Sequence, residues 1–311
     1  MLQPSFDPGL TQKYTGPLSR TINANGEFNI RRRGTTWRDI HPYLFLINAS
    51  TPKFMTWVLG TFALINLVFA ALYMWAGIEH LKGAEADTRF LEFLNAFFFS
   101  THTLTTVGYG NMYPVGTVAN SLAALEALLG LTGFAVITGL VFGRFSKPSA
   151  RIGFSDRILI APYSDGISLQ FRIVNRRTNN LLELSARLLL MTVETGAAGL
   201  QRKFQPLELE RNDVLFFPLT WTVVHPITPS SPLHGKSAED LKDLQAEILI
   251  LIKGFDETFG QTVNVRYSYR HDQIAWGGKF TPAFEVESGG DLCLEVDRVS
   301  NFEAVSLPPL D

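Results

Sequence analysis

The sequence predicts an α-helical membrane pore followed by an all-β sandwich, and three observations predict it. Residues 54–75 carry no charged side chain, and residues 115–142 carry only Glu126. Helices of that length cover the roughly 30 Å hydrocarbon core of a bilayer. A third apolar run, 90–114, lies between them, and short strands separated by turn-rich pieces follow residue 148. Such strands are typical of a β-sandwich.

We therefore divide the chain of 311 residues into four parts. A polar segment covers residues 1–35, and an amphipathic surface helix is expected over 36–50. The pore domain covers 51–147 and consists of an outer helix, a pore helix, a filter and an inner helix. The β-sandwich covers 148–311 and is expected to be cytoplasmic.

Composition excludes several classes of protein. The formal charge is −2, so the chain lacks the basic excess that nucleic-acid binding requires. The single cysteine, Cys293, excludes an intrachain disulfide framework and a thiolate metal cluster. The sequence contains no phosphate-binding glycine loop or nucleophile motif, so we expect neither an enzyme nor an organic cofactor.

Residues 36–50 have the spacing of an amphipathic helix. Apolar side chains recur at helical intervals at Trp37, Ile40, Tyr43, Leu44 and Ile47. A helix of this kind lies on the membrane surface. Pro42 interrupts the pattern, so an ordinary solvated connector stays an alternative.

Charge predicts the topology of the two spanning runs. Basic residues precede the first run and follow the second, whereas the loop between the runs carries more acidic than basic side chains. The positive-inside rule then places both termini in the cytoplasm. The first fifty residues show no secretory signal, so we expect a multi-pass protein of the plasma (inner) membrane.

The run 90–114 is too short to span the bilayer and too apolar to be a simple exposed loop. Irregular backbone at membrane depth is tolerated only where protein or a water-filled pore surrounds it. The run therefore predicts a re-entrant segment, with a pore helix over 93–104. The carboxyl end of that helix favours a cation through the helix dipole.

The re-entrant segment ends in Thr-Thr-Val-Gly-Tyr-Gly, residues 105–110, and this motif carries the predicted chemistry. Gly108 and Gly110 reach backbone angles that are closed to other residues, so successive carbonyl groups can face one path. A ladder of carbonyl oxygens replaces the hydration shell of a potassium ion. The predicted filter is Thr106, Val107, Gly108, Tyr109 and Gly110, with K+ ions at the first four. One segment cannot surround an ion, so a homotetramer is required.

Four further stretches accompany the filter, and the FRIVNRR and IAWGGKF pieces within them are the more specific. The four stretches are GRFSKPSARIGFS after the second run, LQFRIVNRRTNNLLE, LTWTVVHPITPSSPLHG and YSYRHDQIAWGGKF. With the filter, they resemble inward-rectifier potassium channels, and most closely the prokaryotic, KirBac-like members. The resemblance runs from about residue 37 to about residue 285. It implies an immunoglobulin-like cytoplasmic domain, a slide helix at the membrane surface and gating at several constrictions.

The resemblance also implies gating positions. Phe142 falls where the inner helices cross and where a bulky apolar side chain can close a pore by dewetting, unless it is an ordinary packing residue. Glu257 lies where an acid attracts blocking cations, unless it is a plain surface carboxylate. The full predicted gate is Phe142, Phe134, Gly260, Gln261 and Thr262, with Gly130 and Gly139 as hinges of the inner helix.

Three positions depart from the family. Phe134 replaces an acid of strongly rectifying members, so we expect weak rectification, without tight block by Mg2+ or polyamines but with block by Ba2+. His102 stands where relatives carry an acid or an amide behind the filter. It either perturbs the filter when it gains a proton or is a structural core histidine. Asn111 replaces the acid that follows the filter in many potassium channels.

Two sets of residues are predicted to support conduction. His102, Thr105 and Glu126 would support the filter. A carboxylate near the middle of a bilayer is costly, so Glu126 either concentrates cations or makes a structural hydrogen bond to the pore helix.

Anionic lipid stabilises each nearby basic residue by about 1 kcal/mol, and the predicted lipid-binding set is Arg32, Arg33, Arg38, Lys53, Arg144, Lys147 and Arg151.

Two other interpretations stay open from the residues. The basic residues also follow from ordinary positive-inside topology, without lipid control. A membrane-anchored sandwich that binds a ligand or partner without conducting ions is the alternative function. The filter argues against it, because an anchor has no use for two glycines in a re-entrant loop.

Overall fold

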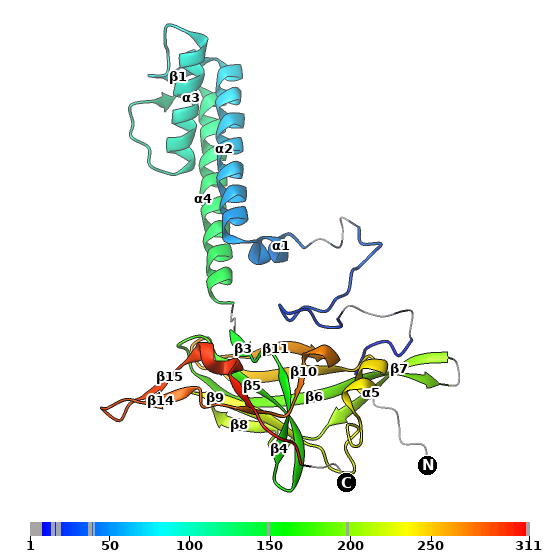
Figure 1. The fold of residues 1–311 in the computed structure, drawn as a ribbon. Coiled ribbons are helices and arrows are strands. Elements are labelled where there is room, and N and C mark those ends of the chain that lie inside the picture. The colour runs from blue at the N-terminus through cyan, green and yellow to red at the C-terminus, as the bar shows by residue number, and fades with distance from the viewer. Residues whose placement is uncertain are drawn as a thin grey trace. The chain divides into compact units, whose positions relative to one another are not determined.

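The computed structural model describes residues 8–13, 16, 20–36, 39, 41–147, 150–196 and 199–308. These residues form two compact units (Figure 1). The pore unit consists of residues within 33–147, and the β unit consists of residues within 148–311 together with residues within 1–32. The amino-terminal segment therefore belongs to the β unit, whereas the sequence predicted a separate part over 1–35.

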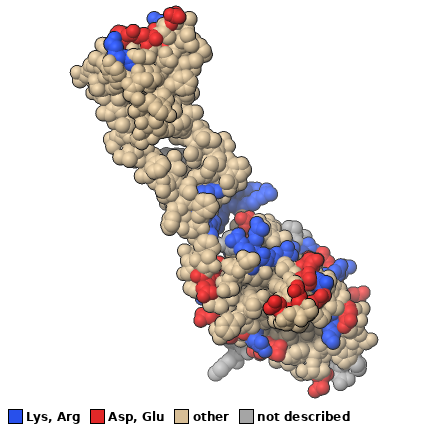
Figure 2. Space-filling view, turned by 90° about the vertical axis from the view of Figure 1, so that its left-hand side faces the viewer, with Lys and Arg blue, Asp and Glu red and all other residues tan. Residues whose placement is uncertain are grey.

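Helices dominate the pore unit. Its elements are α1 (Pro42–Asn48), α2 (Thr51–Ala76), the 3-10 turn η2 (Ile78–His80), β1 (Leu81–Lys82), α3 (Arg89–Leu104), β2 (Tyr113–Pro114) and α4 (Thr117–Phe145). Both α2 and α4 have a mean hydropathy of 1.9 and are long and apolar enough to cross a membrane. Figure 2 shows a long uncharged surface along these helices, with charged side chains gathered toward its ends.

The surface helix is shorter than the sequence predicted. The described helix α1 covers Pro42–Asn48, and Pro42 stands in its first turn, where a missing N–H removes no intrahelical bond. The proline therefore starts the helix and does not interrupt it. Trp37 and Ile40, which were expected to extend the helix toward residue 36, lie outside the described residues.

The three longer helices of the pore unit share one apolar core. Its buried members are Phe69, Ala70, Tyr73, Leu81, Ala84, Ala96 and Phe99. Phe99 of α3 meets Tyr73 of α2 edge to face, with ring centroids 5.1 Å apart. This packing fixes α3 against α2, and so it also positions the segment that follows α3 (Figure 1).

The β unit is a sandwich of two five-stranded sheets, as the sequence predicted. The first sheet has the order β11-β10-β6-β7, with β8 paired to β6, and the second has the order β12-β4-β5-β3, with β9 paired to β5. The first sheet contains β6 (Leu181–Gly196), β7 (Gly199–Leu207), β8 (Asp213–Phe216), β10 (Glu247–Asp256) and β11 (Gln261–Arg270). The second contains β3 (Ile152–Phe154), β4 (Ile158–Tyr163), β5 (Gly166–Asn175), β9 (Thr220–Pro226) and β12 (Ile274–Trp276).

Smaller elements complete the β unit. They are α5 (Ala238–Asp243), η3 (His271–Gln273), the ribbon of β13 (Gly278–Phe280) with β16 (Phe302–Ala304), the ribbon of β14 (Phe284–Val286) with β15 (Leu292–Leu294), and η4 (Val296–Ser300). Side chains that alternate along the strands fill the space between the sheets. Ile248, Ile250 and Ile252 of β10 meet Ile158 and Phe171 of the opposite sheet in this core.

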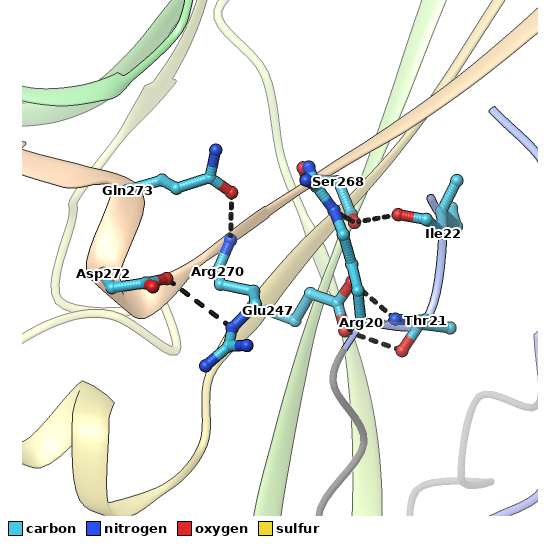
Figure 3. Close-up of polar contacts among 8 residues, drawn as sticks. All are labelled: Arg20, Thr21, Ile22, Glu247, Ser268, Arg270, Asp272 and Gln273. Atoms are coloured by element: carbon cyan, nitrogen blue, oxygen red, sulfur yellow. Dashed lines mark hydrogen bonds and ion pairs between the residues drawn. The ribbon is translucent and has the colours of Figure 1, made fainter. Parts of the chain in front are cut away.

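The amino-terminal segment docks on the first sheet through a short polar row (Figure 3). The Thr21 hydroxyl donates to Glu247 Oε2 at 2.6 Å, and the Thr21 amide donates to the same carboxylate at 2.9 and 3.1 Å. Arg20 Nε donates to Ser268 Oγ at 3.0 Å, and Ser268 Oγ donates to the Ile22 carbonyl at 3.0 Å. Ile22 is 3% exposed. The segment is therefore part of the sandwich surface.

His225 of β9 is a buried titratable group of the β unit. Its Nδ1 contacts the Glu208 carbonyl, and its Nε2 lies 2.8 Å from Ser231 Oγ. A carbonyl only accepts, so the neutral ring donates from Nδ1 and accepts from the Ser231 hydroxyl. Burial disfavours the imidazolium and lowers the pKa of His225, which outweighs the opposing influence of the Glu208 carbonyl and carboxylate.

This burial predicts a pH-dependent stability. Because the folded pKa of His225 lies below its unfolded value of about 6.5, the unfolded chain binds more protons as the pH falls through that value. We expect the free energy of unfolding of the full chain in detergent to decrease from about pH 7 to about pH 5. Urea titrations should show a smaller decrease in His225→Gln than in a control that replaces the exposed His234 by Gln. An equal decrease in both variants would contradict this account.

Candidate ion-binding site

The backbone of residues 105–110 alternates between two conformations. Thr106 has φ +61°, Gly108 has φ +55° and Gly110 has φ +81°. Every second residue is thus left-handed, which glycine adopts without strain and a β-branched residue adopts only at a cost. Their left-handed backbone, and not crowding, is what requires glycine at 108 and 110, because a Cβ at either position would meet no atom of the described residues within 4 Å.

Hydrogen bonds to the end of α3 orient this segment. The amides of Val107 and Gly108 both donate to the His102 carbonyl, at 2.9 and 3.2 Å. In a trans peptide the C=O points opposite to the N–H, so the carbonyls of Thr106 and Val107 point away from α3. No described residue donates to a carbonyl of residues 105–110, all of which are exposed. The segment thus presents free oxygens on one side.

Two predicted supporting residues lie at the last turn of α3. The Thr105 hydroxyl donates to the Thr101 carbonyl at 2.6 Å and so closes the end of the helix. The His102 ring meets the Tyr109 ring edge to face, with centroids 4.7 Å apart. His102 therefore contacts the filter twice, through its backbone carbonyl and through its ring.

Glu126 is buried in α4 and joins all three long helices. Its Oε2 accepts from the Tyr73 hydroxyl of α2 at 2.8 Å, and its Oε1 contacts the Ser100 hydroxyl of α3. Ser100 Oγ also lies 3.0 Å from Asn66 Oδ1, and the Asn66 amide donates to the Phe62 carbonyl at 2.7 Å. Asn66, Ser100 and Glu126 are each 0% exposed.

Sequence reasoning missed the two partners of this carboxylate, Tyr73 and Ser100, and also Asn66, which contacts Ser100. Tyr73 and Asn66 could have been found, because each is a polar side chain in the uncharged run 54–75. Ser100 gave no such signal, because it stands among other polar side chains near the end of α3. Tyr73 and Asn66 stand seven residues apart, or two helical turns, so both lie on one face of α2. That face is the one that meets Glu126.

Gly130 lies where α4 passes the carboxyl end of α3. A Cβ on Gly130 would overlap the Leu104 carbonyl oxygen, whereas one on Gly139 would meet no atom of the described residues within 4 Å. Helix α4 continues through both positions. Gly130 is therefore a site of close helix contact, and the hinge role of the two glycines stays a prediction.

Two of the predicted gate residues stand out from α4. Phe134 is 73% exposed and Phe142 is 72% exposed within one chain. Phe145, which the sequence analysis did not select, is 78% exposed. Within the part of the chain that the structure describes, these phenylalanines are mostly exposed, and so they are available to line a space between copies.

The remaining gate residues form the turn between β10 and β11. Gly260 adopts φ +60°, and Gln261 and Thr262 begin β11. The buried Asp256, another residue that sequence reasoning missed, closes this turn through its Oδ1, which accepts from the amides of Thr258 and Phe259 at 3.0 and 3.3 Å. The nearby Glu257 accepts from Asn180 Nδ2 at 3.1 Å on the surface.

Arg144 has a structural role that the predicted lipid site did not include. Its Nη1 donates to the carbonyls of Leu46, Ile47 and Ala49 at 2.7, 3.1 and 2.8 Å, and its guanidinium stacks over Phe54. The last carbonyls of a helix lack intrahelical partners, so Arg144 of α4 satisfies the carboxyl end of α1.

The other basic residues fall into three groups. Lys147 Nζ donates to Asn48 Oδ1 at 2.6 Å and strengthens the same link between α4 and α1. The remaining described members, which are all exposed, are Arg32 and Arg151 in the β unit and Arg33 and Lys53 in the pore unit. Arg38 lies outside the described residues.

Comparison with known proteins covers both units. The profile of the family described as inward rectifier potassium channel C-terminal domain matches residues 152–310, and the profile described as ion channel matches residues 53–147. The inward rectifier potassium channel Kirbac3.1 of Paramagnetospirillum magnetotacticum is 36% identical over 90% of this chain and 94% of its own length.

Two animal relatives are also similar over most of this chain. Human G protein-activated inward rectifier potassium channel 1 is 30% identical over 92% of the chain. The chain spans 62% of that longer relative. Mouse G protein-activated inward rectifier potassium channel 3 is 28% identical over 93% of the chain and 78% of its own length.

The contact at Gly130 gives a prediction about stability. Ala is intrinsically about 1 kcal/mol better than Gly in a helix, but a methyl group forced against the Leu104 carbonyl should cost about 1–3 kcal/mol. We expect Gly130→Ala to unfold at a lower temperature than the unaltered protein in detergent. The matched control is Gly60→Ala on α2, where the added Cβ meets nothing within 4 Å. Equal stability of the two variants would show that α4 and α3 do not touch as described.

Proposed function

Because the chain belongs to the inward rectifier potassium channel family, we propose that it conducts K+ through a filter formed by residues 106–110 of four identical copies. The family is one of ion channels and not of enzymes. The observation that carries the proposal is the row of exposed carbonyls in residues 105–110 that no described residue uses. An ion that has lost its water needs such a row of oxygens.

Selection follows from how these oxygens are supplied. Four copies around an axis place the carbonyls of one residue in a ring, and successive rings replace the hydration shell of the ion as it moves. The Thr106 hydroxyl adds an oxygen at the inner end of this path. The carboxyl end of α3 adds a partial negative charge that favours the cation near the inner end of the filter.

Gating is proposed at two levels. Phe134 and Phe142 stand out from α4, and rings of phenylalanine in a tetramer would form apolar constrictions that close by dewetting. The turn at Gly260, Gln261 and Thr262 would form a second, cytoplasmic constriction. Weak rectification follows, because Phe134 supplies no charge for Mg2+ or polyamines to bind.

Anionic lipids are proposed to modulate the channel from the cytoplasmic side of the plasma membrane. With both termini inside, the exposed side chains of Arg33 and Lys53 would meet the headgroups of the inner leaflet. Arg144 and Lys147 would act through α1, which they bind, and only in part through lipid. Arg32 and Arg151 complete the proposed set on the β unit.

Reconstitution tests this function directly. We expect the purified protein in KCl-loaded liposomes to pass K+ but not Na+, and Ba2+ to block the flux. Gly108→Ala should abolish the flux, because alanine resists the left-handed backbone at this position; Gly60→Ala should not. Vesicles that pass both ions equally, or a purified protein that is monomeric in mild detergent, would overturn the proposal. A tetramer without flux would favour the anchored sandwich.

Two substitutions distinguish a structural role of Glu126 from a cation-concentrating one. We propose that Glu126 is structural, since its carboxylate is bonded to α2 and α3. Glu126→Ala removes the described partner of the Tyr73 hydroxyl, while the Ser100 hydroxyl keeps Asn66 Oδ1, and one unsatisfied buried group should cost about 1–3 kcal/mol of stability. Glu126→Gln keeps a hydrogen-bonding group and should retain both stability and single-channel conductance. A reduced conductance in a stable Glu126→Gln channel would instead support a cation-concentrating role.

A further inference from the structure

The outer end of the proposed filter needs a support of its own. On the inner side, the His102 carbonyl receives the amides of Val107 and Gly108. Beyond Gly110, none of the described ion pairs reaches the filter or residues 111–116. Something else must fix the segment that leaves the filter.

That segment is paired with the loop between α2 and α3, residues 77–88. Strands β1 and β2 pair in antiparallel register, with Leu81 opposite Pro114 and Lys82 opposite Tyr113. The Val115 amide donates to the His80 carbonyl at 2.8 Å and extends the ladder. Residues 113–115 are therefore attached to the α2–α3 loop just after the filter ends.

Gly83 brings the loop closest to the filter. It adopts φ +85°, and a Cβ on it would overlap the carbonyl oxygen of Asn111 and lie 3.4 Å from Met112 Cγ. Asn111 directly follows Gly110, the last residue of the filter. Any side chain at position 83 must therefore displace the Asn111–Met112 peptide group, which begins one residue after the last filter residue.

The loop itself is anchored in the helix core. Leu81 and Ala84 are 1% and 0% exposed, and both belong to the cluster that contains Phe69 and Phe99. Asn95 Nδ2 of α3 donates to the Ala84 carbonyl at 3.1 Å. The position of Gly83 is thus set by α2 and α3, and not by a freely moving loop.

From these contacts we infer that the α2–α3 loop is the outer brace of the filter and that Gly83 is its positioning residue, an inference that rests on the proposed conduction through residues 106–110. Gly83 touches no ion. It keeps Asn111, and through it Gly110 and Tyr109, in the geometry in which their carbonyls form a ring. Selectivity depends on the size and number of such oxygens, so a displaced Asn111 should weaken the outermost site first.

The chain offers a closely matched control. Gly116 lies at the end of the same ladder and has φ +80°, but a Cβ on it would have the His80 Nδ1 as its nearest neighbour, at 3.7 Å. Alanine at either position must therefore adopt a left-handed φ, which strains the backbone at both, and only alanine at 83 also overlaps the filter segment. A third variant, Asn95→Asp, keeps the shape of the side chain and removes the donor to Ala84.

Two measurements on the full-length protein test the inference. In planar bilayers, Gly83→Ala should raise the permeability of Na+ relative to K+ by about tenfold, while Gly116→Ala stays near the unaltered ratio. Hydrogen exchange of the amides of residues 107–115 should be faster in Gly83→Ala than in Gly116→Ala. Asn95→Asp should shift both readouts in the same direction by a smaller factor, which keeps the test decisive if Gly83→Ala fails to assemble.

The outcomes separate this inference from the proposed function. If the unaltered protein does not select K+ over Na+, the proposed function fails, and the exchange rates still decide whether the loop supports the segment. Equal selectivity and equal exchange in Gly83→Ala and Gly116→Ala would overturn the brace. Equal losses in both would overturn it too, because backbone strain alone would then explain the effect.

Discussion

Carbonyl groups inside a membrane protein must have a partner, and the pore unit is organised around a segment whose carbonyls have none among the described residues. The amides of Val107 and Gly108 donate to the end of α3, and residues 105–110 are exposed. Such a segment keeps its shape only if its surroundings fix it, since the oxygens gain nothing until an ion or water arrives. The contacts around the filter can all be understood as ways of meeting this requirement.

Helix α4 supplies much of that fixation along its length. Near its start, Glu126 bonds to Tyr73 of α2 and Ser100 of α3. One turn later Gly130 allows α4 to touch the end of α3 without a side chain between them. At its far end Arg144 binds the last carbonyls of α1. A movement of α4 would therefore change its contacts both at the carboxyl end of α3 and at α1, which gives the gate proposed on α4 a physical link to its surroundings.

Several features of the site could be found from residue types alone. A glycine in a re-entrant loop, a long run without charge and a carboxylate in an apolar helix each have few physical explanations, and they led to the filter, the two spanning helices and the importance of Glu126. The partners of Glu126 were not found, because a serine and a tyrosine in a helix are common and their facing directions depend on packing. Gly83 was missed for the same reason, because its role depends on its contact with Asn111 across the β1–β2 ladder, and that contact does not follow from the residue type.

The sequence by itself determined the class of fold and the presence of two spanning helices, because hydrophobic length and periodicity are local properties. It also marked the segment proposed as the filter, because the left-handed backbone that Gly108 and Gly110 adopt is a local property too. Tertiary structure alone decided three other points: that the first segment docks on the β unit through Thr21 and Glu247, that Arg144 serves α1, and that Gly130 and Gly83 are contact sites. Each joins residues far apart in the chain, and which distant groups meet is set by how helices and strands pack and not by the local pattern of either partner.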